Sequence, residues 1–423
     1  MTNDTAYDPG IHLPWAGKTV RMEEIEDVLA SLWKISVDNL RTGANVRVRT
    51  SILNLVICTP DIETAQQASR ILRQLSSTHL ARVTILILDR DENAPSAIKA
   101  WVTLRCFSMI SDLMRHCFEQ TTMLASGNAI RSVANVIQPL LKPDLPVYLW
   151  WLGDPPEQND PTFNSLVDVS SRMIVDSTSF FNLEQDIRTL SALFQAAPNC
   201  ALSDLNWGRI TPWRQLIIQF FDVPEYRQYL AGVTSIEIEH IAAPLATPMR
   251  TEQGEVSPNP TRALLLAGWL KARLGWSLTA DSLNNNRDTA SGTYHWNMER
   301  LASARTTRSL TPIRSKPTKP GNQASISIRP RVQSEMRPGS ISLVRLVSNM
   351  DNRQATFTIS REDDPKHVFT SVELSHEARF TRTVSLSIVQ NESDLLHDEL
   401  EILGHDYHFE QTLLEVAEML AEE

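Results

Sequence analysis

The sequence predicts a mixed α/β protein, with a Rossmann-like sheet flanked by helices over residues 1–197 and an α+β region with a mostly antiparallel sheet over residues 198–423. Three observations predict this class. Strand-like and helix-like segments alternate through residue 197. Evenly spaced segments with strand patterning dominate the end of the chain. A chain of 423 residues with 42% hydrophobic side chains is also long enough for two core-forming domains.

The N-terminal region contains a strand–helix–strand pattern. Residues 22–40 have the apolar spacing of an amphipathic helix. A β-branched run over 47–58 is typical of a strand, residues 61–76 are helix-like, and residues 81–88 form a second, buried strand. Two strands joined by one helix at this spacing pair in parallel through a right-handed crossover.

The alternation continues to residue 197. Residues 98–107 and 117–124 are extended, and Cys106 and Cys117 approach each other if these segments form a hairpin. Two separate thiols are the favoured interpretation in a chain of this size, and a regulatory disulfide is the alternative. The later elements are a helix over 128–141, strands over 147–152 and 172–176, and a helix over 183–194.

The second region follows a joint at residues 196–199. It contains a strand over 235–240 and a helix over 261–274 that is apolar almost all round, which indicates burial. A basic, Ser/Pro-rich segment occupies 301–340. Strands are then expected over 325–330, 341–348, 354–361, 367–374 and 379–389, and two acidic helices over 393–402 and 407–421.

The net charge of −10 comes from the acidic end. Residues 392–423 hold eleven Asp or Glu and no Lys or Arg, which leaves +1 for the rest of the chain. A solvated helical face is the favoured interpretation, and a basic partner surface is the alternative. The basic segment has no aromatic residues for base stacking, so we expect no nucleic-acid binding and interpret it as a charged loop or a docking arm.

The sequence also bears on cellular location. Asp4 and Asp8 precede the first basic residue, Lys18, and no apolar core of a signal peptide follows. The purest apolar run, 263–267, is too short to span a bilayer. We therefore expect a cytoplasmic protein that has no membrane segment.

The motifs of common enzyme classes are missing. The 14 glycines do not form a dinucleotide or P-loop phosphate cradle, and neither a nucleophile elbow nor a His-Glu-x-x-His motif occurs. His405 and His408 have a spacing that permits metal ligation on a helix, although a polar surface turn is favoured. These absences predict a binding protein that is not an enzyme and holds no cofactor or metal.

Residues 204–222 are the most distinctive stretch. Thr211 is expected to cap a helix that begins with Pro212. The apolar residues of that helix recur on one face, at Trp213, Leu216, Ile217, Phe220 and Phe221. Trp207, Arg209 and Arg214 cluster with Trp213 at its entrance. These side chains either cover the helix start and pair with acids such as Asp204, or they serve as interface anchors or phosphate ligands.

This stretch resembles the signature of the glucose-6-phosphate dehydrogenase assembly protein (OpcA) family, Asp-Leu-x-Trp-x-Arg-x-Thr-x-Trp-Arg followed by an apolar helix. Further segments resemble that family in the same order, at 140–151 (Leu-Leu-Lys-Pro-Asp-Leu-Pro-Val-Tyr-Leu-Trp-Trp), 172–177 (Arg-Met-Ile-Val-Asp-Ser) and 263–276. The resemblance implies a non-catalytic protein that binds glucose-6-phosphate dehydrogenase, promotes its active oligomer and activates it allosterically in the oxidative pentose phosphate pathway. In photosynthetic bacteria the family that this chain resembles is associated with thioredoxin-linked redox control through cysteines toward the C-terminal end, and this chain has no cysteine after Cys200. Either such control is absent here, or it uses other thiols, or it acts on the enzyme instead.

The resemblance also suggests where the partner is bound. The residues expected to form or brace the partner surface are Trp207, Arg209, Trp213 and Arg214, with Asp204 in the same signature. Those expected to line a neighbouring cleft are Trp150, Trp151 and Asp176. The alternative function is a sugar-phosphate-binding sensor or enzyme that uses the α/β cleft, with Arg209 or Arg214 on the phosphate.

Overall fold

The structure is a computed structural model, and its contacts divide the chain into two compact units. Unit 1 comprises residues 1–175, 197–202 and 392–404, and unit 2 comprises residues 176–196, 203–391 and 405–423. The described residues are 18–38, 46–49, 51–75, 81–91, 93–108, 114–156, 160–242, 250–251, 254–255, 259–282, 287–288, 291–300, 323–332, 336–350, 353–361, 367–375, 380–385 and 391–421. Most of the basic segment 301–340 lies outside them.

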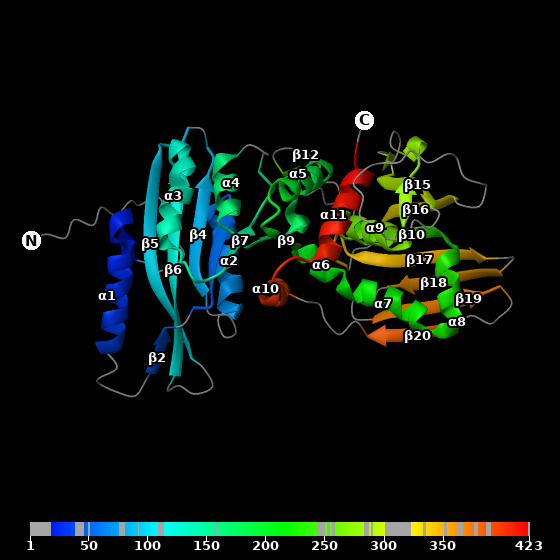
Figure 1. The fold of residues 1–423 in the computed structure, drawn as a ribbon, viewed down its shortest axis with the longest axis horizontal. Helices are drawn as coiled ribbons and strands as arrows, with labels where there is room; N and C mark the ends of the chain where they lie inside the picture. The colour runs from blue at the N-terminus through cyan, green and yellow to red at the C-terminus, as the bar shows by residue number, and fades with distance from the viewer. Residues whose placement is uncertain are drawn as a thin grey trace, which may run out of the picture. The chain divides into compact units, whose positions relative to one another are not determined.

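Unit 1 is built on a mixed sheet with the strand order β1-β5-β6-β4-β3-β7-β8-β9, and β2 pairs with β6 (Figure 1). The pairs β3–β4, β3–β7, β4–β6 and β7–β8 are parallel, whereas β5 is antiparallel to β6. The strands are β1 (Lys18–Val20), β2 (Val46–Arg49), β3 (Leu53–Thr59), β4 (Ala81–Asp89), β5 (Ala97–Ser108), β6 (Met114–Ser126), β7 (Val147–Trp151), β8 (Arg172–Val175) and β9 (Ala201–Asp204). Every residue of β3 and β7 is buried, as expected for central parallel strands.

The longer helices of unit 1 each bury an apolar side. α2 buries its apolar residues against β3 and β4, and α10 packs on α2. Asp160 caps α4, and Pro161 occupies the first turn, where its missing N–H costs no hydrogen bond. The helices are η1 (Met22–Glu24), α1 (Ile25–Asp38), α2 (Ile62–Leu75), η3 (Gly127–Ser132), α3 (Val133–Ile137), η4 (Gln138–Leu140), α4 (Pro161–Asp168) and α10 (Glu392–Glu401).

Unit 2 contains a second large sheet, in the order β13-β15-β16-β10-β17-β18-β19-β20, with β14 paired to β15. β10 runs parallel to β16, and the neighbouring strands pair in antiparallel fashion. Its strands are β10 (Val233–Ala242), β13 (Trp276–Leu278), β14 (Arg287–Asp288), β15 (Thr293–Arg300), β16 (Gln323–Val332), β17 (Ile341–Met350), β18 (Arg353–Ser360), β19 (His367–Leu374) and β20 (Phe380–Ser385), with a separate pair β11 (Arg250–Thr251) and β12 (Gly254–Glu255).

Helices cover this second sheet. α9 packs on β10 and β16, α7 packs on β18, and α11 packs on α9 and α5. Gly275, in the left-handed region at φ +64°, ends α9. The helices are η5 (Ser177–Ser179), α5 (Leu183–Ala196), α6 (Leu205–Arg209), α7 (Thr211–Asp222), α8 (Pro224–Arg227), η6 (Gln228–Gly232), α9 (Thr261–Leu274), η7 (Ala280–Ser282) and α11 (Tyr407–Met419).

The predicted mixed α/β class is confirmed by two large sheets with helices. The parallel pairing across the βαβ unit and the helix over 261–274 are confirmed as well. The single strand expected over 47–58 is wrong, because β2 and β3 are separate strands in different places of the sheet. No described helix combines the length with the apolar composition that is required to cross a bilayer.

The predicted hairpin forms from β5 and β6, and Cys106 lies opposite Cys117 in its register. Cys117 is disulfide-bonded, which replaces the favoured interpretation of two separate thiols. A regulatory use of this bond stays a prediction. Cys58 and Cys200 are free and buried, and burial raises the pKa of both thiols, to about 12 for Cys200.

The acidic end is less solvated than the charge pattern suggested. Glu399 and Glu410 are buried in α10 and α11. Within unit 1, Glu399 pairs with Arg172. Within unit 2, the buried Lys271 of α9 pairs with Glu415 and Glu418. Part of the acidic surplus therefore compensates basic groups inside the fold.

Candidate functional site

The signature residues of unit 2 lie at the starts of several helices. Asp204 ends β9 and caps α6, where it accepts a hydrogen bond from the backbone N–H of Asn206 at 2.9 Å. The same carboxylate accepts from the backbone N–H of Ser177 at 3.1 Å and from the Ser177 hydroxyl. Burial, with the negative charge of Asp176 nearby, raises the pKa of Asp204 to about 6.

Asp176 forms a two-pronged ion pair with Arg209. Nη1 and Nη2 of Arg209 each donate to one carboxylate oxygen at 2.7 Å. Burial acts to raise the pKa of Asp176, but the hydrogen bonds and charge of Arg209 outweigh it and hold the pKa below its usual value. The side chains are only 11% and 13% exposed, so the carboxylate and the guanidinium are satisfied by each other.

Asn206 links this pair to α9. Its Oδ1 accepts from Arg209 Nη1 at 3.0 Å, from Thr178 Oγ1 at 2.9 Å and from Arg262 Nε at 3.0 Å. Arg262, in the first turn of α9, also donates to Ser340 Oγ at 3.3 Å. Burial, with the positive charge of Arg209 nearby, lowers the pKa of Arg262 to about 10.

A second side-chain amide connects the segment after β8 with the start of α9. Asn259 Nδ2 donates to the backbone carbonyls of Ser177 and Thr178 at 3.0 and 3.1 Å. Its Oδ1 accepts from the backbone N–H of Thr261 at 2.9 Å. We call the connected side chains of Asp176, Ser177, Thr178, Asp204, Asn206, Arg209, Asn259, Thr261 and Arg262 the helix-start network.

Trp207 anchors the last helix of unit 2. Its Nε1 donates at 2.7 Å to Asp406, which caps α11, and its ring lies 5.8 Å from that of Phe409. The Arg214 guanidinium carbon lies 3.5 Å from the centre of the Trp207 ring. Arg214 also donates to Thr211 Oγ1 at 2.7 Å. These contacts place both side chains within the packing between α6, α7 and α11.

The remaining aromatic candidates are core residues. Trp213 is buried with the rest of the predicted apolar face of α7. The expectation that Thr211 caps α7 is wrong, because Ile210 is the N-cap residue and makes no side-chain cap. Trp150 and Trp151 are buried on β7 of unit 1. Trp151 donates to the carbonyl of Asp154 at 2.9 Å and meets the edge of Phe163.

The helix-start network is suited to structural stabilisation more than to chemistry. Its carboxylates, amides and guanidinium groups bond one another, and no hydroxyl or thiol is paired with a histidine base among the described contacts. The described part of the chain also holds no cluster of three metal-ligating side chains. His405, one of the two histidines considered as metal ligands, contacts Glu410 at 2.5 Å.

The sequence did not single out Asn206, Asn259 or Arg262. Asn206 lies within the signature, but a single amide carries no pattern that distinguishes it from a loop residue. Asn259 stands two residues before the helix at 261–274, where a capping role could have been suspected. Arg262 lies 56 positions from Asn206, and only the tertiary fold brings them together.

Both regions of the chain match models of known protein families. Residues 72–192 match the family model described as the glucose-6-phosphate dehydrogenase subunit N-terminal domain, and residues 200–413 match the corresponding C-terminal domain. The chain is 34% identical over 161 residues to a putative OxPP cycle protein OpcA of Synechocystis sp.. It is 30% identical over 209 residues to the protein of the same description in Nostoc punctiforme.

These alignments are partial. They cover 38% and 49% of this chain, and 30% and 40% of the two relatives. The chain thus aligns with less than half the length of each relative. Among solved structures, a levoglucosan dehydrogenase in complex with NADH and levoglucosan aligns with a TM-score of 0.41 and 10% identity over 86% of this chain and 95% of that one. A likeness this distant carries no functional argument.

Proposed function

This chain belongs to the OpcA family of glucose-6-phosphate dehydrogenase assembly proteins, and we propose on that premise that it binds the dehydrogenase, promotes its active oligomer and raises its activity without catalysing a reaction itself. One observation carries the proposal, namely that the two family models together match residues 72–192 and 200–413. The expected setting is the oxidative pentose phosphate pathway in the cytoplasm.

The geometry of the signature supports a non-catalytic role. Arg209 donates through both terminal nitrogens to Asp176, which disfavours it as the phosphate ligand of the alternative sugar-phosphate function, while Arg214 stacks on Trp207 and donates to Thr211. The buried Trp207 and Trp213 brace the helices from inside and do not themselves reach a partner. Partner contact must then come from exposed side chains.

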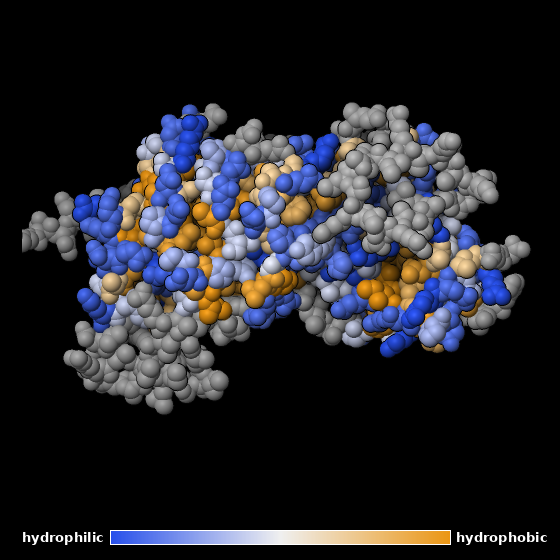
Figure 2. Space-filling model, viewed as in Figure 1, coloured by the Kyte–Doolittle hydropathy of each residue, from blue (hydrophilic) through white to orange (hydrophobic). Residues whose placement is uncertain are grey.

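We place the contact on the outer side of α7 to η6, which exposes Ile218, Val223 and Leu230. Apolar surface is visible in this region of unit 2 in Figure 2. α7 directly follows α6, which Asp204 of the helix-start network caps, and α7 is held along its length by its own buried stripe. Exposed apolar residues on a rigid helix provide contact area at little cost in conformational entropy.

An activator must bind the active form of the enzyme more tightly than the inactive form. A tenfold shift toward the active form requires about 1.4 kcal/mol of differential affinity. A single buried anchor at an interface can supply this amount.

The test is size-exclusion chromatography of the dehydrogenase with and without this chain, with activity measured across the peaks. We expect co-elution, a larger enzyme species and higher activity. Ile218→Glu, at a side chain 48% exposed, should weaken activation about tenfold. Leu414→Glu, at a side chain 36% exposed on α11, is the matched control and should not. A dehydrogenase whose size and activity are unchanged by the wild-type chain, under oxidising and reducing conditions alike, would refute the proposal.

A further inference from the structure

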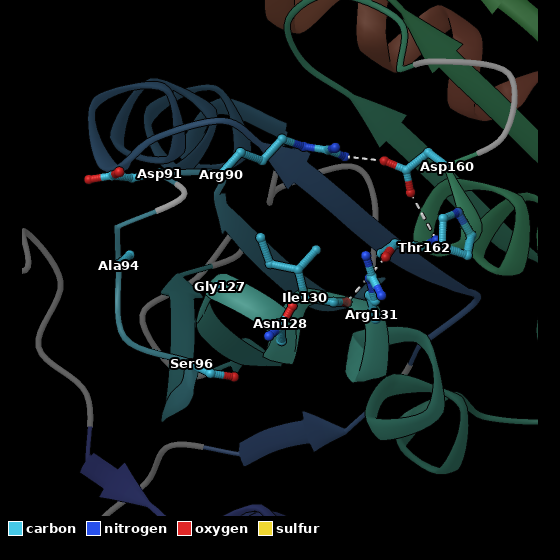
Figure 3. Close-up of a pocket in the computed structure, with 11 residues that line it drawn as sticks. Arg90, Asp91, Ala94, Ser96, Gly127, Asn128, Ile130, Arg131, Asp160 and Thr162 are labelled. Carbon is cyan, nitrogen blue, oxygen red and sulfur yellow. Dashed lines mark hydrogen bonds and ion pairs between the residues drawn. The ribbon is translucent and has the colours of Figure 1, made fainter.

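A polar pocket of about 620 Å³ lies within unit 1. Its lining includes Arg90, Ser96, Gly127, Asn128, Arg131 and Asp160, which surround the opening in Figure 3. We propose that this pocket binds a small phosphorylated polyol, with Arg131 on the phosphate and neutral polar groups on the hydroxyls. This inference is independent of the proposed binding to the dehydrogenase.

The pocket lies where open α/β sheets bind ligands. Arg90 directly follows β4, and Gly127 directly follows β6, which is parallel to β4. The chain leaves β3 toward β4 on one side and later reaches β7 on the other side of β3. This change of direction falls between β3 and β7, and the pocket lies beside it at the same carboxyl edge of the sheet, at the ends of β4 and β6, the edge where ligands of open α/β sheets bind.

One wall of the pocket depends on a glycine. Gly127 adopts φ +57°, and a Cβ atom there would lie 2.9 Å from the carbonyl oxygen of Ala94 and 3.2 Å from Ser96 Cα. The Ser126 hydroxyl donates to the carbonyl of Pro95 at 2.6 Å and holds the same segment in place. The close approach of residues 94–96 is therefore fixed by local geometry, and the cavity is already formed without a ligand.

Two carboxylates line the pocket: Asp91, whose Oδ1 accepts from the backbone N–H and the Nδ2 of Asn93 at 2.9 and 3.3 Å, and Asp160. Arg90 Nη2 pairs with Asp160 Oδ2 at 2.5 Å. The other oxygen of Asp160 accepts from the backbone N–H groups of Thr162 and Phe163 at 2.9 and 3.0 Å, as the cap of α4. Asp160 thus has its partners within the protein, and Arg90 is held beside the opening.

The remaining polar groups are available to a ligand. The side chains of Arg131, Asn128 and Ser96 make no hydrogen bond or ion pair with another described residue. Arg131 offers the planar fork that suits a phosphate. Asn128 and Ser96 can donate to and accept from hydroxyl groups. A volume of about 620 Å³ falls in the usual range for small-molecule sites, and the polar lining favours a hydrophilic ligand.

Isothermal titration calorimetry of the full chain tests the inference with four probes: ribose 5-phosphate, AMP, inorganic phosphate and ribose. We expect ribose 5-phosphate or AMP to bind at least tenfold more tightly than inorganic phosphate, and ribose to give no heat. Preference between the two phosphorylated probes distinguishes a sugar phosphate from a nucleotide as the ligand.

Two variants locate the binding. Arg131→Gln, at an exposed position that folding should tolerate, is expected to weaken binding of the preferred probe at least tenfold. Arg70→Gln, on the exposed side of α2 in the same unit, is the matched control and should leave affinity unchanged. Three outcomes would overturn the proposal: neither phosphorylated probe gives heat up to ~10 mM, the affinity is unchanged in Arg131→Gln, or the affinity falls equally in both variants.

Discussion

The ion pair between Asp176 and Arg209 gives the most direct test of the helix-start network. Arg209→Leu removes two charge-assisted hydrogen bonds at 2.7 Å, together with donation to Thr178 Oγ1 at 3.1 Å and to Asn206 Oδ1 at 3.0 Å. A carboxylate that is 11% exposed is left without its cation. Removing one partner of a buried pair costs about 3–5 kcal/mol of unfolding free energy, and we expect about 3 kcal/mol here.

Urea unfolding followed by tryptophan fluorescence and circular dichroism measures this loss, and agreement of the two signals checks that one transition is observed. The double-mutant cycle with Asp176→Asn isolates the pair. Arg227→Leu, at an exposed arginine of α8, is the control and should change stability by less than about 0.5 kcal/mol.

The pH dependence gives a second criterion. The pKa of Asp176 is lowered in the folded state, so the pair stabilises the fold above the unfolded pKa of about 4 and loses this contribution as pH falls through the folded value. The deficit of Arg209→Leu should therefore be largest near neutral pH and shrink below about pH 4. A deficit under about 1 kcal/mol, or additive effects of the two substitutions, would show that the reasoning is wrong.

Two further predictions concern the interior of unit 2. Burial lowers the pKa of His240 from 6.5 to about 4. As pH falls, His240 is therefore protonated in the unfolded chain before it is protonated in the folded chain, and the free energy of unfolding should fall by about 3 kcal/mol between pH 6.5 and 4. His240→Gln should remove this loss in denaturation measured at a series of pH values, whereas Asp204→Asn should steepen it, because the raised pKa of Asp204 acts in the opposite direction between about pH 6 and 4. Gly268→Ala would place a Cβ atom 2.5 Å from Val416 Cγ2, where α9 packs on α11, and should cost about 1–3 kcal/mol in urea unfolding. Val416→Ala should recover part of that loss, and a Gly268→Ala variant as stable as the wild type would contradict the packing argument.

The sequence predicted the elements whose signals are local. The apolar stripe of α7 and the all-apolar character of α9 are periodic patterns, and both helices bury the expected residues. The strands around α2 were found because β-branched runs and an amphipathic helix alternate at βαβ spacing. The end of α9 coincides with Gly275, a signal that also requires no tertiary information.

Other features depend on tertiary contacts that no local pattern records. The expected strand over 47–58 is divided because β2 pairs with β6 whereas β3 lies between β4 and β7. Trp207 finds its hydrogen-bond partner Asp406 at a separation of 199 positions. The pocket of unit 1 likewise draws its residues from the ends of β4 and β6 and the start of α4, each unremarkable alone.

The position of the signature changes how its function should be tested. Trp207, Trp213 and Asp204 are buried, and Arg209 is largely so, which means that their substitution perturbs folding before it reports on a partner. Loss of activation in such variants would therefore fit a bracing role and a contact role equally well. Exposed positions on α7, such as Ile218, separate the two, because they leave the helix-start network intact while changing the surface offered to the dehydrogenase. If the network affects activation only through folding, activation should follow the stability of unit 2 in network variants, whereas Ile218→Glu should weaken activation without any change in stability.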